Sequence, residues 1–498
     1  MDKANPWEKD RVLCIIHRLL PCLDDRRHMG QVCRSWRAAV APQQHPPQRP
    51  LPWILVPSAR GPTFSCALRG CPTHDFHVPK DALTARYFGS YDGGCLFLAF
   101  GQTDGHALLN LRTNQLFDLP DVVGVQMLGH RNSVHIVMLA VTLSSPPEHE
   151  DCVAAAVSSV WPLDPRIHAF WRMERDVAVM ATNGFTGPIL EDVIHHNGAF
   201  YFLTREEDLH VFPVSEFYEY DDDKLKIPPM DIRRFRNGQR YYRKNVVARY
   251  LVESGGHLLM VVRFANVRDW PPTTRAFRVL EMVELPQEAT DNEVFFKYTW
   301  NELVSLDGRM LFLARGCSRS YEVADYPGLE FNDGVYFLDD GRLQQGDTTL
   351  ITNRAYPCRD NGKCTMATAD AASRVDNFLP EQSPSNYSSP VWLLPEERFR
   401  GLQSKRRATF PAHLPGRFGS NRYTLADPQD LLNYEECEFL LIAVSDDDVE
   451  EELGLQPETE TETTEAERGD ASAVGCLDLV KLFGEVADVK LLLSGSWD

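Results

Sequence analysis

The chain has 498 residues, of which 43% are hydrophobic and 10% aromatic, and its formal net charge at pH 7 is −20. Acidic residues are concentrated between 446 and 470, so the rest of the chain is only mildly acidic. This balance argues against a dedicated nucleic-acid binder, whose domain is normally basic. The length and apolar content allow a large core, and the 33 Pro and 31 Gly favour short strands joined by turns.

Cysteine usage and hydropathy indicate the compartment. The twelve cysteines contain no CxxC pair, which indicates reduced thiols. The N-terminus lacks the apolar core of a signal peptide, and the run 134–143 is too short to span a bilayer. We therefore expect a cytoplasmic or nuclear protein that does not enter a membrane.

Two short amphipathic helices are predicted within residues 7–42. The first ends at Pro21, and the second begins with Asp24 as a candidate N-cap and ends before Pro42. Apolar residues recur at helical spacing at Val12, Ile15, Ile16 and Leu19 in the first helix and at Met29, Val32, Cys33, Trp36 and Val40 in the second. So small a unit cannot bury much core alone and must pack on another surface.

These helices resemble an F-box, the module that binds the Skp adaptor of cullin-based ubiquitin ligases. The resemblance rests on the apolar positions of the first helix and on the run Val32-Cys33-Arg34-Ser35-Trp36-Arg37. It implies that the adaptor-binding residues are Leu13, Ile16, Leu19, Val32, Cys33 and Trp36. The chain has Lys9-Asp10-Arg11 where an F-box usually has Leu-Pro, and the alternative is that the helices only cap the following domain.

A Pro/Gln-rich linker at 43–50 separates the helices from a predicted β region at 51–395, which begins with a strand at 53–56. In this region a turn containing Gly is followed five times by a run of aromatic and aliphatic residues. The aligned glycines are Gly94, Gly198, Gly256, Gly308 and Gly334. Glycine supplies the positive φ of a tight hairpin, and the spacing is typical of propeller blades.

Further motifs resemble one plant family, which joins an F-box to a KIB-type β-propeller. They are a kelch-like Asn110-x-x-Thr113 followed by Leu119-Pro120, and the runs 86–94, 332–340 and 390–395. The length of the region predicts about seven blades, with six or eight as alternatives. A pair of β-sandwiches is the other fold that these strands allow.

Two stretches without the repeat, 144–165 and 213–246, are predicted to be insertions at the rim of the propeller, where loops usually carry recognition. The second contains acids followed by interleaved basic and aromatic residues. The alternative is a solvated hairpin whose charges neutralise each other. The predicted target-binding residues are Arg233, Arg234, Phe235, Arg236, Tyr241 and Tyr242.

No catalytic or metal motif stands out. The group Cys66, Cys71, His74 and His77 lacks the spacing of a structural zinc site, so core thiols and surface imidazoles are expected instead. The pair His195-His196 has no nucleophile motif near it and is expected to be structural. We therefore predict neither metal, cofactor nor enzymatic activity.

The C-terminal part divides into three segments. Residues 396–445 receive no assignment, 446–470 are predicted to be disordered because their acids offer little to bury, and 471–498 suggest a terminal helix. Together, the sequence predicts the substrate-recognition subunit of an SCF-type ubiquitin ligase, bound through a Skp-type adaptor to cullin. The alternative is a propeller scaffold or a transcription-associated binding protein without adaptor contact.

Overall fold

The computed structural model of the chain describes most of the region between residues 12 and 395. The described ranges are 12–17, 20, 22–39, 50–58, 61–66, 73–74, 78–83, 85–100, 105–127, 130–160, 166–173, 175–181, 187–220, 224–236, 241, 245–266, 273–286, 296–326, 332–340, 356, 358–366, 374–376, 384–385 and 388–395. The predictions for 396–445, 446–470 and 471–498, and almost all of the linker 43–50, lie outside these residues.

The N-terminal helices are shorter and more numerous than predicted. Residues 12–17 are helical, and α2 (Leu23–Gln31) and α3 (Arg34–Ala39) follow. The prediction of the second helix as one continuous element is therefore wrong, because the chain forms α2 and α3 in its place. Between them the Cys33 Sγ accepts the backbone N–H of Trp36 at 3.4 Å and caps the start of α3. The N-cap of α2 is Cys22 and not Asp24.

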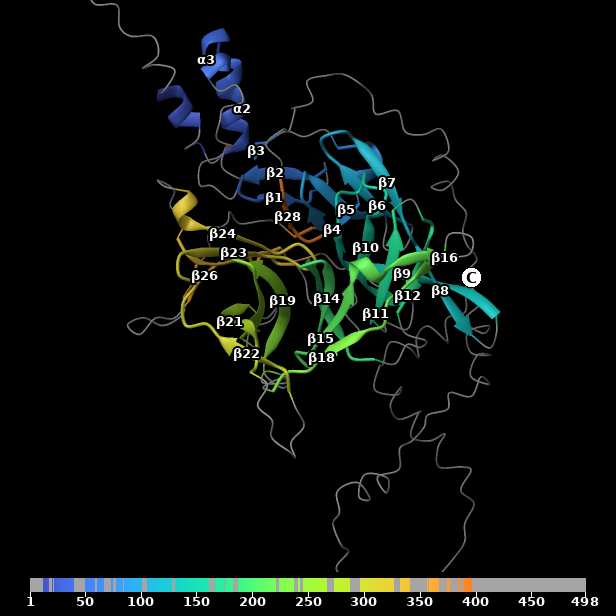
Figure 1. Cartoon of the computed structure of the whole chain (residues 1–498). Helices are drawn as coiled ribbons and strands as arrows, with labels where there is room; N and C mark the ends of the chain where they lie inside the picture. Colours follow the sequence, from blue (N-terminus) through green and yellow to red (C-terminus); the bar gives the residue numbers. More distant parts are fainter. Residues whose placement is uncertain are drawn as a thin grey trace, which may run out of the picture. The chain divides into compact units, whose positions relative to one another are not determined.

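The strands between Trp53 and Leu393 form a β-propeller, whose open sheets we call blades A, B, D, F and G. Figure 1 shows these sheets following one another around a common centre. Blade A contains β28 (Val391–Leu393), β1 (Trp53–Val56), β2 (Thr63–Cys66) and β3 (Thr73–His74), and blade B contains β4 (Arg86–Tyr91), β5 (Cys95–Ala99), β6 (His106–Asn110) and β7 (Gln115–Leu119).

The remaining blades follow in chain order. Blade D contains β13 (Leu190–His196), β14 (Ala199–Thr204), β15 (Leu209–Pro213) and β18 (Asp231–Arg233). Blade F contains β19 (Val246–Ser254), β20 (His257–Ala265), β21 (Thr274–Glu284) and β22 (Tyr298–Glu302). Blade G contains, in spatial order, β24 (Arg319–Glu322), β23 (Arg309–Leu313), β25 (Gly334–Phe337), β26 (Gly362–Thr365) and β27 (Arg374–Asp376). Short 3₁₀ turns are η1 (Lys80–Ala82), η2 (Val214–Glu216) and η3 (Val323–Asp325), and β16 (Tyr218–Tyr220) pairs only with β17 (Lys224–Lys226) within the described residues.

A closed sheet lies between blades B and D. It consists of β8 (Val122–Met127), β9 (His130–Leu143), β10 (Val153–Val160), β11 (Arg166–Arg172) and β12 (Val177–Met180). The sheet closes because β8 pairs with β9 on one side and, in parallel, with β12 on the other. The prediction of about seven blades is thus wrong: the described strands form five open blades and this closed sheet.

The prediction that 144–165 is an insertion at the rim is wrong for residues 153–160, which form β10. Every residue of β10 is buried, and β10 pairs with β9 and β11 at the centre of the closed sheet. The stretch 213–246 is only partly an insertion, because β18 forms the outer edge of blade D.

The recurring glycines stand in turns as predicted, with one exception. Gly94, Gly198, Gly256 and Gly308 have φ values between 73° and 83°, which is the left-handed region that hairpin turns require. The first three connect the first two strands of blades B, D and F. Gly334, at φ 152°, instead begins β25, which runs parallel to β23.

The ring closes through its two sequence ends. Strand β28 pairs with β1 inside blade A, so the last strand of the β region completes the sheet that the first one started (Figure 1). Trp392 on β28 is fully buried, and its indole N–H donates to the Leu313 carbonyl of blade G at 3.0 Å. Closure removes the exposed edges that an open array of sheets would leave.

Candidate functional site

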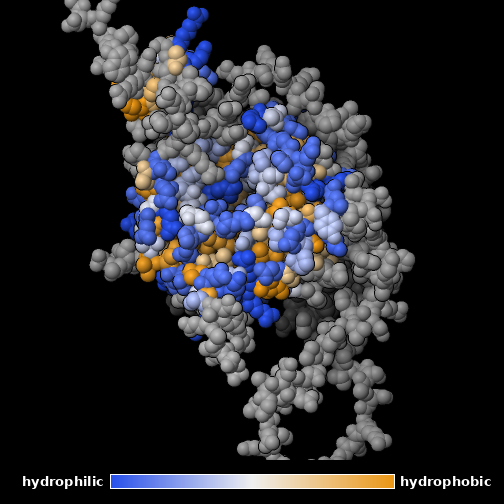
Figure 2. All heavy atoms as spheres, viewed as in Figure 1, coloured by the Kyte–Doolittle hydropathy of each residue, from blue (hydrophilic) through white to orange (hydrophobic). Residues whose placement is uncertain are grey.

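The N-terminal helices carry exposed apolar side chains. Val12 is 53% exposed, Ile15 49%, Ile16 42% and Val32 60%, and these four are half of the large hydrophobic residues exposed within the described chain. Figure 2 shows apolar side chains at the surface of this segment, at the upper left. Large aliphatic side chains exposed to solvent in one short segment are typical of surfaces that bind other proteins.

The other residues predicted for adaptor binding occupy varied positions. Leu13 and Trp36 are half-buried, and Cys33 is exposed while its sulfur caps α3. Leu19 lies outside the described residues. The helices thus place Ile16 and Val32 in solvent and Trp36 partly so, but adaptor contact itself remains a prediction.

A second surface lies where the outer strands of blades D and F meet. The chain after β18 runs beside β22, with a bridge between Phe235 and Tyr298 and the Arg236 N–H donating to the Tyr298 carbonyl at 3.0 Å. Successive side chains of an extended segment point to opposite faces. Arg233 and Phe235 therefore face inward, whereas Arg234 and Arg236 are exposed.

The inward residues belong to the core. Phe235 is 3% exposed and stacks on Trp300 with a centroid separation of 4.2 Å. Arg233 lies over the rings of Tyr201 and Tyr298, at 5.2 and 5.0 Å from their centroids. Of the predicted target-binding residues, Phe235 is thus not available to a partner, because it fills the joint between two blades.

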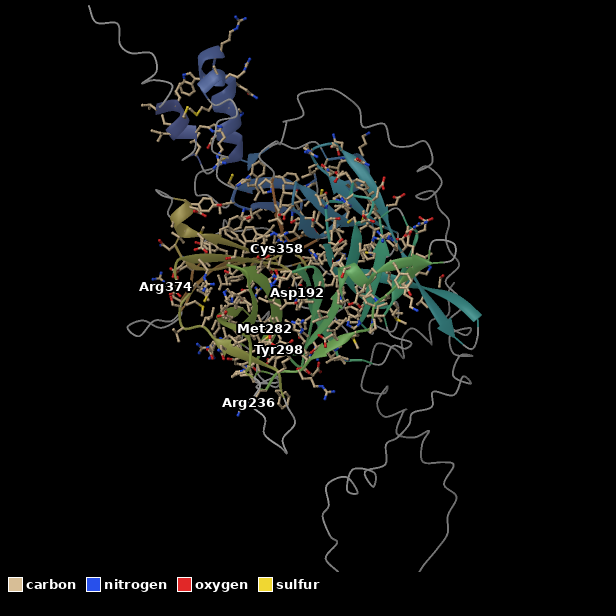
Figure 3. The ribbon with its side chains drawn as sticks, in the orientation of Figure 1. Asp192, Arg236, Met282, Tyr298, Cys358 and Arg374 are labelled. Atoms are coloured by element: carbon tan, nitrogen blue, oxygen red, sulfur yellow. The ribbon has the colours of Figure 1, made fainter. Side chains whose placement is uncertain are left out.

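The outward residues are the two arginines, which we call the rim pair. Figure 3 shows Arg236 extending away from the sheets below Tyr298. Neither Arg234 nor Arg236 makes an ion pair with a described carboxylate, whereas Arg233 pairs with Asp231 at 3.3 Å. Tyr241 is 4% exposed and its N–H donates to Glu207, so it too is a core residue, and Tyr242 lies outside the described residues.

Buried charges join the blades to one another. Arg249 of blade F contacts Glu191 at 3.1 Å and Glu207 at 3.2 Å, both from blade D. Arg263 of blade F contacts Asp340 at 3.2 Å and Asp360 at 2.9 Å, next to blade G. Burial opposes the charge of Arg263, but Tyr250, Asp360 and Asp340 around it raise its pKa above the usual value. These paired charges link blade F to blade D on one side and to the residues next to blade G on the other.

Comparison with known proteins assigns the fold to a family. Residues 64–361, more than half of the chain, match the KIB1-4 beta-propeller family. The chain belongs to this family. No curated protein matches it. A solved structure described as BBS1N in complex with ARL6DN, soaked with mercury, is 9% identical with a TM-score of 0.26, and covers 66% of this chain and 76% of that chain; a likeness this weak carries no inference.

Membership of the KIB1-4 beta-propeller family points to a protein-interaction domain. No described helix of this KIB1-4 propeller is both long enough and apolar enough for a transmembrane span. The surfaces that the geometry offers for interaction are the N-terminal helices and the rim pair.

Asp192 of this KIB1-4 propeller belongs to no motif of the sequence, and only the fold reveals its role. It is fully buried in β13, and its carboxylate accepts the backbone N–H of Val193 at 2.8 Å, of Leu251 at 2.7 Å and of Gly316 at 2.6 Å. Burial raises the pKa of Asp192 to about 7, although these N–H donors lower it. Asp192 lies among the sheets in Figure 3 and ties blades D, F and G together.

The histidines and thiols of the KIB1-4 propeller have structural partners. His196 contacts Asn197 at 2.9 Å and Glu253 at 3.8 Å, and the structural role of the pair His195-His196 stays a prediction. His168 and His210 share a hydrogen bond of 2.9 Å within an aromatic cluster, and burial lowers their pKa values to about 3 and about 4. Within the described residues no three metal-binding side chains gather, and Cys71 and His77 lie outside them.

Proposed function

We propose that this protein is the substrate-recognition subunit of an SCF-type ubiquitin ligase in the cytoplasm or nucleus. The N-terminal helices bind a Skp-type adaptor, and through it cullin, while the propeller binds the target protein. The observation that carries the proposal is the exposure of Ile16, in the first helix, and of Val32, between α2 and α3, in a segment that precedes a propeller of the KIB1-4 family. Apolar anchors of this kind usually dominate the affinity of helical interfaces.

In this role the chain does not catalyse the reaction. It holds the target near the ubiquitin-conjugating enzyme, which raises the effective concentration of a target lysine. A receptor of this type needs a rigid platform, and the paired charges of Arg249 and Arg263 between blades support one. The rim pair Arg234 and Arg236 favours an acidic segment of the target, because both side chains are exposed and neither makes an ion pair with a described carboxylate.

Isothermal titration calorimetry, in which a purified Skp-type adaptor is titrated into the full chain, tests the proposal. We expect Ile16→Glu and Val32→Glu each to weaken binding by roughly 10- to 30-fold, because each removes an apolar anchor worth about 1.4–2 kcal/mol. Both side chains are already exposed in the free protein, so these variants are expected to fold normally.

The matched control is Arg234→Glu, an exposed charge reversal on the propeller that leaves adaptor affinity unchanged. If the wild type shows no binding at micromolar adaptor, the ligase assignment fails. A propeller scaffold without adaptor contact then replaces it, and the exposed apolar helices bind a different protein.

A further inference from the structure

Two cysteine sulfur atoms meet where the N-terminal helices begin. Cys22 is the N-cap of α2, and Cys66 is the last residue of β2 in blade A. Their Sγ atoms are 3.4 Å apart although the residues are separated by 44 positions in the sequence. Both side chains are buried, at 1% and 7% exposure.

The contact lies inside an apolar cluster. Cys22 packs with Trp53 and Leu55 of β1 and with Phe64 of β2. The start of α2 is thus held on blade A by side-chain packing and by this sulfur pair. A covalent bond at this point would fix helix and blade together.

Other buried thiols of the propeller differ from this pair. The Cys358 thiol donates to the carbonyl of Tyr356, and the Cys152 thiol to that of Ser145. Burial raises the pKa of Cys317 to about 11 and that of Cys358 to about 12. For Cys152 and Cys358 the described partner is thus a carbonyl and not a second sulfur.

We propose that Cys22 and Cys66 are a redox modification site, which forms a reversible disulfide under oxidising conditions and ties the N-terminal helices to blade A. A disulfide bond is about 2.05 Å long, so the sulfur atoms approach each other by about 1.4 Å. The N-cap position allows this movement, because Cys22 has extended backbone angles and is not inside the helix. Disulfides that form within cells are typically transient and redox-sensing.

The oxidant is hydrogen peroxide, and the steps balance. One thiol attacks the peroxide oxygen, so that an S–O bond forms, the O–O bond breaks and the sulfenic acid and one water result. The second thiol then attacks the sulfenic sulfur, which forms the S–S bond and releases the second water. Two electrons pass from the sulfur atoms to the peroxide, and a dithiol such as dithiothreitol reverses the change.

Peptide mapping of the full chain tests the inference independently of adaptor binding. Wild-type protein is treated with hydrogen peroxide, free thiols are blocked with iodoacetamide, and the chain is digested with trypsin without reduction. Trypsin places Cys22 in the peptide 19–26 and Cys66 in 61–69, whereas Cys71 falls in 70–80. We expect the peptides 19–26 and 61–69 to appear as one cross-linked species that dithiothreitol separates.

The decisive measurement uses the wild type, so it does not depend on a variant folding. Cys66→Ser abolishes the linked species, and the matched control Cys33→Ser, which changes an exposed thiol of the same helical segment, retains it. The inference is overturned if both peptides are recovered fully alkylated after oxidation, or if Cys66 is linked to Cys71 instead. It is also overturned if native mass spectrometry finds a zinc ion on the untreated chain that protects the two thiols.

Discussion

Asp192 is the residue whose substitution most directly tests how the blades are held together. Its carboxylate is fully buried and accepts one N–H from its own strand, one from Leu251 of blade F and one from Gly316 beside blade G. Asp192→Asn keeps the shape of the side chain and one oxygen. The amide nitrogen then faces the N–H of Leu251, so that two donors meet, which costs about 1–3 kcal/mol of unfolding free energy.

The cost of this substitution depends on pH. Burial raises the pKa of Asp192 from 3.8 to about 7, so between these values the native state binds a proton that the unfolded chain releases. The stability that Asp192 contributes is therefore complete at low pH and lost as the pH rises through 7. From pH 5 to pH 8 the wild type should lose about 2–3 kcal/mol relative to Asp192→Asn, which has no such group.

Urea unfolding at pH 5 and pH 8, followed by tryptophan fluorescence, measures this difference. Asp325→Asn, at an exposed position in η3, is the matched control: it keeps Asp192, so its unfolding free energy should fall between pH 5 and pH 8 as that of the wild type does. If the difference between wild type and Asp192→Asn stays the same at both pH values within about 0.5 kcal/mol, Asp192 ionises at its usual pKa. Its three N–H donors, and not burial, would then govern its charge.

Two further substitutions test the closure of the ring and its packing. Trp392→Ala removes a fully buried ring and its hydrogen bond to the Leu313 carbonyl, so urea unfolding should show a loss of about 3–5 kcal/mol of unfolding free energy. The unfolding should remain a single transition, because closure links all blades. A loss below about 1 kcal/mol would contradict this expectation. Gly316→Ala places a Cβ at 2.5 Å from the Val141 oxygen at φ +74°, so we expect about 1–3 kcal/mol of destabilisation by thermal melting. Gly187→Ala, whose Cβ would have no atom of the described residues within 4 Å, should melt like the wild type.

The sequence by itself determined the local features of this protein. The turn Asn197-Gly198 has positive φ at both residues, and such a turn can be recognised from residue type because only Gly and Asn adopt these angles readily. The same holds for the turn after β6, where the Asn110 side chain accepts the N–H groups of Arg112 and Thr113. The strand Trp53–Val56 and the propeller class followed from such local signals.

Only the tertiary structure decided which strands pair and which side chains are buried. β10 carries three alanines and two serines among its eight residues and lacks the Gly turn and aromatic run of the repeat, yet it is a fully buried strand because β9 and β11 lie on both sides of it. Phe235 and Arg236 were equivalent members of one basic and aromatic segment in the sequence. The pairing beside β22 separates them into core and surface, because the face of an extended residue depends on register with a strand some sixty residues away, and no local pattern encodes that register.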